Sequence, residues 1–245
     1  MTIGIGMICK ESIVLASDSQ ASYGGPSTHK RTDTQKIVEA NFSGTKACIS
    51  MAGGIQFFNA LAEKIELLAP TTEINSRRSV ADVVQGAVRA LKSELMGQAV
   101  GPQQSGERWD AIFRDSGCEL MIAYYFEERM PCLYEVDFSL GLVVPVKTQF
   151  HVVGCAFELA DFILADAPIG QMSTVQAMAV AAYVVEMAKN HDQKCGGRTQ
   201  MALVYPKNAS VLDGGEAGKF EEVARQFEAK TFVFNKVERT DPPRA

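Results

Sequence analysis

Thr2 is the residue whose position in this chain could give it unusual chemistry. It follows Met1 directly and precedes the strand-like segment Ile3-Gly4-Ile5. Small penultimate residues such as threonine permit removal of Met1 by the usual aminopeptidase. Thr2 would then carry a free α-amine with a reference pKa of about 7.7–8.0, which can accept the hydroxyl proton through a bridging water. A nucleophile and its base would thus lie on one residue.

An aspartate and a lysine are spaced so that they could assist Thr2. A cation near the amine lowers the pKa of the amine and keeps it neutral, and a carboxylate is needed to orient that cation. The sequence supplies Asp18 at the end of the second expected strand and Lys36 at the start of the third. Taken singly, Asp18 is typical of a turn and Lys36 of a solvated strand edge. Their joint spacing therefore carries the prediction that all three converge at one end of a sheet.

The six cysteines are scattered and form no CxxC pair, so the sequence contains neither a zinc ribbon nor a thioredoxin-type motif. We expect reduced, buried thiols, no metal and no cofactor. An alternative is that Cys155 or Cys195 acts as a nucleophile or binds a metal, with His191 four residues before Cys195 on one helical face. A reactive thiol needs a nearby base and a positively charged setting, so buried thiols are the preferred interpretation.

Composition excludes several classes of function. The chain has 245 residues, 47% of them hydrophobic, with a formal net charge of −5. It lacks the basic surface that attracts nucleic acid, and no apolar run reaches the roughly 18 residues needed to span a bilayer. The N-terminus lacks the pattern of a secretory signal. We therefore expect a cytoplasmic protein that binds neither nucleic acid nor membrane.

Apolar periodicity predicts strands and helices in separate runs along the chain. Strands are expected in 3–8, 13–16, 36–40, 46–52, 118–126, 130–138, 141–147, 150–154, 199–206 and 210–213, and a strand-like run covers 230–237. Helices are expected in 57–68, 80–95, 156–167, 174–190 and 221–229. Residues 22–33 and 97–110 are expected to be loops, and 238–245 a disordered end.

Runs of strands separated by helix pairs indicate an α+β fold. Two antiparallel sheets stacked face to face, with a helix pair on each outer side, would bury all the apolar stripes and give a four-layer αββα sandwich. The sequence shows no internal boundary, so residues 1–245 are expected to form one domain in which 215–245 is a C-terminal extension. The helix 174–190 is apolar on two sides, and a subunit interface is a second use for it.

The ordered set of motifs resembles the proteasome-type N-terminal-nucleophile (Ntn) hydrolases, namely proteasome β subunits and the bacterial HslV peptidase. The similarity runs through TIGIGMICKESIVLASDSQASYGG, QKIVEA, ISMAGGIQ, VVGCAFE and NHDQKCGGRTQMALVY, over about residues 2–205. Any one of these segments would be a weak match, but their order is specific. The resemblance implies the Ntn-hydrolase form of the αββα sandwich.

The resemblance also assigns roles to individual residues. It implies that Thr2 is the catalytic threonine, with Asp18 and Lys36 as its charged partners. The backbone N–H of Ser50 is expected to form the oxyanion hole, where only a backbone donor is needed. Asp192 matches a carboxylate that supports the threonine from the side.

Two cysteines depart from the pattern of the family. Cys155 and Cys195 occupy positions where proteasome β subunits carry serines that support the threonine and its amine. A thiol is a weaker hydrogen-bonding group than a hydroxyl. Gln20 is more similar to HslV, which lacks the carboxylate at Asp192. This combination indicates a divergent bacterial homologue, such as the Anbu-like proteins.

We therefore expect a threonine endopeptidase that hydrolyses unfolded proteins or peptides inside a homo-oligomeric ring or stack. An ATP-dependent unfoldase is a partner by analogy with the family. Two alternatives remain open. One is an assembly protein with little or no peptidase activity, which the two cysteines motivate. The other is an amidase that uses the same nucleophile on small acyl substrates.

Overall fold

The computed structural model describes residues 2–23, 29–31, 33–53, 55–71, 73–97, 118–138 and 140–237. Its strands are β1 (Ile3–Ile8), β2 (Ile13–Asp18), β3 (Ala21–Tyr23), β4 (His29–Arg31), β5 (Ile37–Phe42), β6 (Thr45–Ala52), β7 (Glu119–Phe126), β8 (Met130–Asp137), β9 (Leu142–Pro145), β10 (Phe150–Gly154), β11 (Thr199–Tyr205) and β12 (Asn208–Val211). Its α-helices are α1 (Ile55–Leu68), α2 (Ser79–Gly97), α4 (Phe157–Leu164), α5 (Thr174–His191) and α6 (Gly214–Val237). Short 3₁₀ turns, η1 (Ala69–Thr71) and η2 (Ile169–Gln171), follow α1 and α4.

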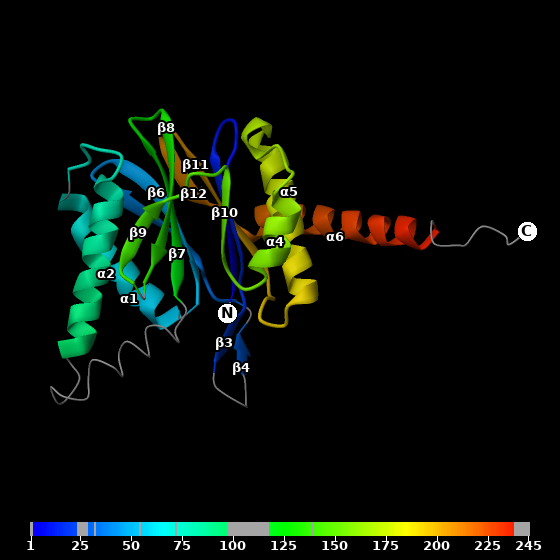
Figure 1. The fold of residues 1–245 in the computed structure, drawn as a ribbon, viewed down its shortest axis with the longest axis horizontal. Helices are drawn as coiled ribbons and strands as arrows, with labels where there is room; N and C mark the ends of the chain where they lie inside the picture. Colours follow the sequence, from blue (N-terminus) through cyan, green and yellow to red (C-terminus); the bar gives the residue numbers. More distant parts are fainter. Residues whose placement is uncertain are drawn as a thin grey trace, which may run out of the picture.

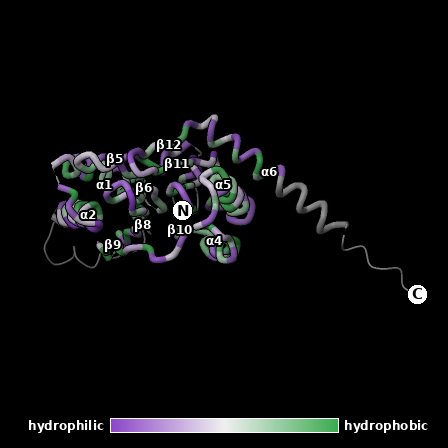
Figure 2. Tube along the Cα trace, turned by 90° about the horizontal axis from the view of Figure 1, so that it is seen from above, coloured by the Kyte–Doolittle hydropathy of each residue, from purple (hydrophilic) through white to green (hydrophobic). Residues whose placement is uncertain are grey.

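The strands form two five-stranded antiparallel sheets, which confirms the predicted α+β sandwich. One sheet has the order β10-β1-β2-β11-β12 and the other β5-β6-β7-β8-β9. Figure 1 shows the sheets between two helix layers, with α1 and α2 on one side and α4 and α5 on the other. Figure 2 shows the same layers from above, with hydrophilic and hydrophobic residues both present along the outer helices.

Three apolar cores lie between the four layers. One core joins α1 and α2 to the β5–β9 sheet, a second joins α4, α5 and α6 to the sheet that contains β1, and a third lies between the two sheets. Side chains alternate across each strand, so one strand can serve two cores: in β1, Ile3 and Ile5 face the helices, while Gly4 faces the other sheet. The described part of the chain contains no helix that is both long and apolar enough to span a membrane.

The two sheets divide the strands differently from the sequence pattern. The expected strands between 118 and 154 follow one another with no helix between them, a pattern that suits a second sheet of their own. Instead, β5 and β6 join β7–β9, and β10 returns to pair with β1, with Ile3 opposite Gly154. Periodicity identifies strands, but their partners are set by which faces meet in the core.

Two local predictions were wrong. Part of the expected loop 22–33 forms the two-stranded β3–β4 hairpin, in which Ala21 is opposite Arg31. The strand-like run 230–237 belongs to α6, where β-type residues continue a helix that begins at Gly214. The loop 98–110 with Trp109 and the end 238–245 lie outside the described residues.

Candidate active site

Thr2 lies at the start of β1 and is only 1% exposed. Its Oγ1 donates a hydrogen bond to the backbone carbonyl of Gln20 at 3.3 Å. Its own carbonyl accepts a hydrogen bond from the backbone N–H of Cys155 at 2.8 Å. Both the hydroxyl and the main chain of Thr2 are therefore fixed from neighbouring segments.

Asp18 ends β2 and is completely buried. Its Oδ1 accepts from Lys36 Nζ at 2.9 Å and from the backbone N–H of Ile3 at 3.2 Å. Its Oδ2 accepts from the backbone N–H groups of Gly196 at 2.9 Å and Gln20 at 3.2 Å. Four donors thus surround the carboxylate, as a buried charged group requires.

Lys36 completes a buried ion pair beside Thr2. Its side chain is 2% exposed, and Nζ also donates to the carbonyl of Gln20. The same carbonyl accepts from Thr2 Oγ1, so the ammonium and the hydroxyl share one acceptor. Burial lowers the pKa of Lys36, and the charge of Asp18 offsets part of this effect. The structure therefore brings together Thr2, Asp18 and Lys36.

Ser50 is placed differently from the sequence prediction. The N–H of Met51 donates to the carbonyl of Lys36 at 3.0 Å, toward β5. Neighbouring N–H groups in an antiparallel strand point to opposite sides, so the N–H of Ser50 points to its ladder partner Met121 on β7. That donor is committed to the sheet, and the structure does not support Ser50 as an oxyanion donor.

Gly53 is the better candidate on β6. It directly follows the last ladder pair, Ala52 with Glu119, and its φ of +102° takes the chain out of strand geometry. By the same alternation its N–H points to the side of Met51 and Lys36. Spacing along the sequence could not distinguish this position from Ser50, because Ser50 lies just before the glycine turn and Gly53 begins it.

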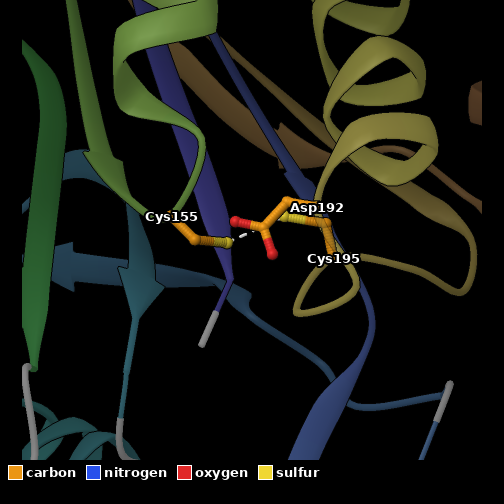
Figure 3. Close-up of side chains that lie close together, drawn as sticks. All are labelled: Cys155, Asp192 and Cys195. Carbon is orange, nitrogen blue, oxygen red and sulfur yellow. Dashed lines mark hydrogen bonds between the residues drawn. The ribbon is translucent and has the colours of Figure 1, made fainter.

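The side chains of Cys155, Asp192 and Cys195 lie close together (Figure 3). The hydrogen bond from the Cys155 N–H to the Thr2 carbonyl places this cluster beside Thr2. The two Sγ atoms are 2.8 Å apart, and both thiols are buried. The sulfur atoms and a carboxylate oxygen of Asp192 all lie within 4.8 Å of one another, which makes this the group of described residues able to offer a metal three ligand atoms. Since the Lys36 ammonium interacts electrostatically with both thiols, it opposes a cation there.

Thiol chemistry in this cluster does not involve His191. The helix α5 ends at His191, and Asp192 already has extended backbone, so Cys195 is not on the same helical face. A hydrogen bond with Cys155 and burial raise the pKa of Cys195, with smaller contributions from the charges of Asp18 and Asp192. Cys195 therefore keeps its proton.

Three positions that act through the backbone were not predicted from the sequence. The N–H of Gly196 binds Asp18, and the carbonyl of Gln20 orients both Thr2 and Lys36. Gly154, with φ +88°, passes so close that a Cβ there would lie 1.9 Å from the carbonyl oxygen of Thr2. The sequence signal was present only for the glycines, as the Gly196-Gly197 doublet and the Gly154 turn.

A surface cavity lies nearby but does not contain Thr2. It has a volume of about 500 Å³, and its lining includes Ser19, Gln35, Arg198 and Leu212. Thr2 itself is 1% exposed in the chain that still carries Met1. Access to its hydroxyl therefore depends on removal of that residue.

A family model described as proteasome subunit matches residues 2–204. The chain is 23% identical over 218 residues to a proteasome subunit beta of Methanocella paludicola, which covers 89% of this chain and 94% of the relative. It is 27% identical over 225 residues to proteasome subunit beta type-5-B of Arabidopsis thaliana, which covers 89% of this chain and 71% of the relative.

Solved structures of Anbu proteins share the fold. An Anbu (Gly-1) mutant from Hyphomicrobium sp. strain MC1 superposes with a TM-score of 0.73 at 15% identity and covers 99% of this chain and all of its own. The ancestral beta-subunit Anbu from Yersinia bercovieri also gives 0.73, at 12% identity over the same shares. A helical assembly of the Anbu complex from Pseudomonas aeruginosa gives 0.65 at 16% identity and covers 99% of this chain and 98% of its own.

Proposed function

The chain belongs to the proteasome subunit family, and we propose that it is a threonine peptidase whose nucleophile is Thr2 once Met1 has been removed. One observation carries the proposal. The buried Asp18–Lys36 ion pair lies beside the Thr2 hydroxyl and shares the Gln20 carbonyl with it. Burying two charged side chains costs free energy of desolvation. A buried ion pair placed beside one hydroxyl is best explained by chemistry at that hydroxyl.

The proposed mechanism begins with proton transfer inside Thr2. The Lys36 ammonium lowers the pKa of the α-amine, which is then neutral and accepts the proton of Oγ1 through a water. Asp18 fixes Lys36 in place. Oγ1 attacks the carbonyl carbon of the substrate peptide, and the protonated amine returns its proton to the leaving amine of the peptide. Water then hydrolyses the acyl-enzyme by the same route.

We assign the oxyanion to the backbone N–H of Gly53, in place of Ser50. Its position past the last ladder pair of β6 leaves the donor outside the sheet. One such donor is worth about 2.7–4 kcal/mol of transition-state stabilisation. Asp192 acts as a positioning residue: its carbonyl accepts the N–H of Cys195, the residue before Gly196, which binds Asp18.

We extend the proposal to assembly and substrates. Proteasome subunits and a solved Anbu complex form multi-subunit assemblies, and we propose a homo-oligomeric ring or stack for this chain. Unfolded proteins or peptides are its proposed substrates, with an ATP-dependent unfoldase as a partner by analogy. Six free cysteines are consistent with a reducing compartment, and the cytoplasm is the proposed location.

A second candidate function is that of an assembly protein with little peptidase activity. The observation that favours it is that Thr2 is 1% exposed with Met1 attached and that its hydroxyl donates to Gln20, so a chain that keeps Met1 would keep this enclosure. A small-substrate amidase would meet the same enclosure with a smaller substrate, and comparing N-acyl amides with peptides as substrates separates it from a peptidase.

The test combines intact mass with covalent labelling. The mass of the purified protein reports whether Met1 is removed. A peptide epoxyketone, which reacts with the hydroxyl and the amine of an N-terminal threonine, is expected to add once to the processed protein. Thr2→Ala is the matched control, because alanine also permits removal of Met1 but lacks the hydroxyl, and Thr2→Ser is expected to keep labelling. A protein that retains Met1, or that loses it and is not labelled, would contradict the peptidase proposal.

A further inference from the structure

Two buried thiols are in direct contact beside Thr2. The Sγ atoms of Cys155 and Cys195 are 2.8 Å apart, about 0.8 Å longer than a disulfide bond. We propose that these two cysteines form a reversible disulfide, and that its formation inactivates Thr2. The bond depends on the thiols alone, whereas the inactivation rests on the proposed function.

The backbone fixes both thiols in this arrangement. Cys155 directly follows β10, and its N–H donates to the carbonyl of Thr2 at 2.8 Å. Cys195 lies in the loop between α5 and β11, and its N–H donates to the carbonyl of Asp192 at 3.0 Å. The two segments are 40 residues apart in sequence, so the bond would join two otherwise separate walls of the site. Little movement is needed to form it.

Hydrogen bonding and burial determine which thiol reacts first. Cys195 holds its proton, because its hydrogen bond with Cys155 and its burial raise its pKa. Cys155, 7% exposed against 4% for Cys195, is therefore the thiol that meets an oxidant. Only a small oxidant fits such burial, and a hydroperoxide is the class that we assign.

The reaction balances with one hydrogen peroxide. Cys155 loses its proton as its sulfur attacks one peroxide oxygen, an S–O bond forms, the O–O bond breaks, and the released hydroxide takes up that proton as water. The sulfur of Cys195 then attacks the sulfenic acid, the S–S bond forms, the S–O bond breaks, and the second water leaves with the proton of Cys195. The two thiols lose two electrons, which reduce the peroxide to two waters.

The same cluster favours a disulfide over a metal ion. Asp192 would be the third ligand, but its Oδ1 accepts the backbone N–H of Lys194 at 2.9 Å. Three ligand atoms leave a tetrahedral metal one short, and the Lys36 charge repels a cation. Formation of a disulfide by the two thiols needs no further ligand and is not opposed by the positive charge of Lys36.

Oxidation would act on Thr2 through the backbone. Closing the remaining gap of about 0.8 Å between the sulfurs is a small movement, but it pulls on two residues of the site. Cys155 holds the Thr2 carbonyl, and Cys195 directly precedes Gly196, which holds Asp18. We expect epoxyketone labelling of Thr2 to slow by about tenfold, the scale expected for the loss of one or two hydrogen bonds.

The experiment uses the full-length assembled protein with hydrogen peroxide. Peptide mapping without reduction is expected to reveal a cross-link between the Cys155 and Cys195 peptides, labelling of Thr2 is expected to slow, and dithiothreitol is expected to reverse both. Cys155→Ser and Cys195→Ser should each label at the same rate with and without peroxide. Cys9→Ser is the matched control, since a hydroxyl can keep the contacts of Cys9 with Ser12, and it should still respond.

Several results would overturn the proposal. They are an absent cross-link in folded protein, an unchanged labelling rate after complete cross-linking, and thiols that react with peroxide only after a chelator is added, which would indicate a metal. The peptide map does not depend on Thr2 chemistry. If reduced protein cross-links but never labels, the peptidase proposal and the inactivation fail while the disulfide stands, so the two failures are distinguishable.

Discussion

At the scale of single residues, the site is organised around the buried charges of Lys36 and Asp18. The Lys36 ammonium donates hydrogen bonds to Asp18 and to the carbonyl of Gln20. The Asp18 carboxylate accepts from Lys36 and from three backbone N–H groups. This arrangement compensates the desolvation of both groups. It also makes the two residues unequal, because Asp18 keeps its backbone donors if Lys36 is lost, whereas Lys36 keeps one carbonyl if Asp18 is lost.

Substitutions of the ion pair should reveal that inequality. We expect Lys36→Met to destabilise the fold by about 3 kcal/mol and Asp18→Asn by about 5 kcal/mol, the range for breaking a buried pair. The double variant should cost less than the sum, because it leaves no unpaired charge. Urea unfolding measures all three, and epoxyketone labelling should be lost in each. Additive free energies would mean that the two residues do not interact in the folded protein.

The residues of the site differ in how well the sequence predicts them. Thr2, Asp18 and Lys36 act through side chains, so their types and spacing were visible. The carbonyl of Gln20 and the N–H of Gly196 act through the backbone, which any residue carries, and only the fold reveals them. The oxyanion role was assigned to Ser50 because sequence spacing does not show which backbone N–H groups form hydrogen bonds with the neighbouring strand.

At the scale of elements, the end of β10 positions Thr2 through a close approach of two backbones. Gly154 adopts φ +88°, and a Cβ would lie 1.9 Å from the Thr2 carbonyl oxygen and 2.7 Å from the Cβ of Ala52. The turn between β5 and β6 has a glycine of similar φ, Gly44 at +91°, with no atom within 4 Å of its Cβ position. Comparing the same substitution at Gly154 and at Gly44 therefore separates the effect of the steric clash from that of backbone strain.

Gly154→Ala is therefore expected to displace Thr2, and Gly44→Ala is not. The left-handed conformation alone costs about 1–2 kcal/mol for alanine, and this is the loss we expect for Gly44→Ala. At Gly154 the clash adds to it, for a total of about 3 kcal/mol or more. Thermal unfolding measures the cost, and epoxyketone labelling should disappear only in Gly154→Ala. Equal behaviour of the two variants would show that the close approach to Thr2 does not matter.

The helix α6 is held to the body by buried charges, and its docking should depend on pH. Glu221 accepts the N–H of Thr199 at 3.1 Å and pairs with Lys189 and Arg225. Burial alone would raise the pKa of Glu221, but these donors outweigh it and lower the pKa below the ordinary 4.5. A lowered carboxyl pKa gives stability that is present above pH 4.5 and is lost as pH falls through the folded-state value.

We expect Glu221→Gln to cost stability at pH 7 and progressively less as pH falls below 4.5, because Glu221 then binds a proton in the unfolded state while it is still ionised in the folded state. The difference should vanish once the pH is below the folded-state pKa and Glu221 is protonated in both states. Urea unfolding of both proteins from pH 7 to pH 3.5 measures the difference. A gap that stays constant over this range would show that the charge of Glu221 does not contribute. The prediction concerns α6 alone, because the Asp18–Lys36 pair is unchanged in both proteins.

The elements were predicted better than their partners. Most strands and helices lie within a few residues of the expected ranges because alternation and helical spacing are local properties. The return of β10 to β1 is a long-range pairing that no local pattern shows. The Phe and Val residues of 230–237 favour a strand locally, but in the structure this segment continues α6.

At the scale of the whole molecule, the outer helix layers expose apolar side chains unequally. Phe162 on α4 is 82% exposed, Phe157 on the same helix 55%, and Val175 at the start of the neighbouring α5 63%. On the opposite layer, the large apolar side chains that the structure describes as exposed are Leu67 and Leu68, at the end of α1. Aromatic residues are enriched in interface cores, so the α4–α5 face is the better candidate for contact between copies of this chain.

Phe162→Glu should therefore break the proposed homo-oligomer. A charge at the centre of an apolar contact leaves an unpaired buried group, whereas on a free surface it costs less than about 0.5 kcal/mol. Sedimentation velocity is expected to give a species well above the 26.6 kDa chain for the wild type and a much smaller one for the variant. Leu67→Glu, on the other layer, should sediment as the wild type does, and circular dichroism should be the same for all three. A Phe162→Glu protein that keeps the wild-type sedimentation coefficient would place the contact elsewhere. If the wild type itself sediments as a single chain, the proposed ring or stack fails.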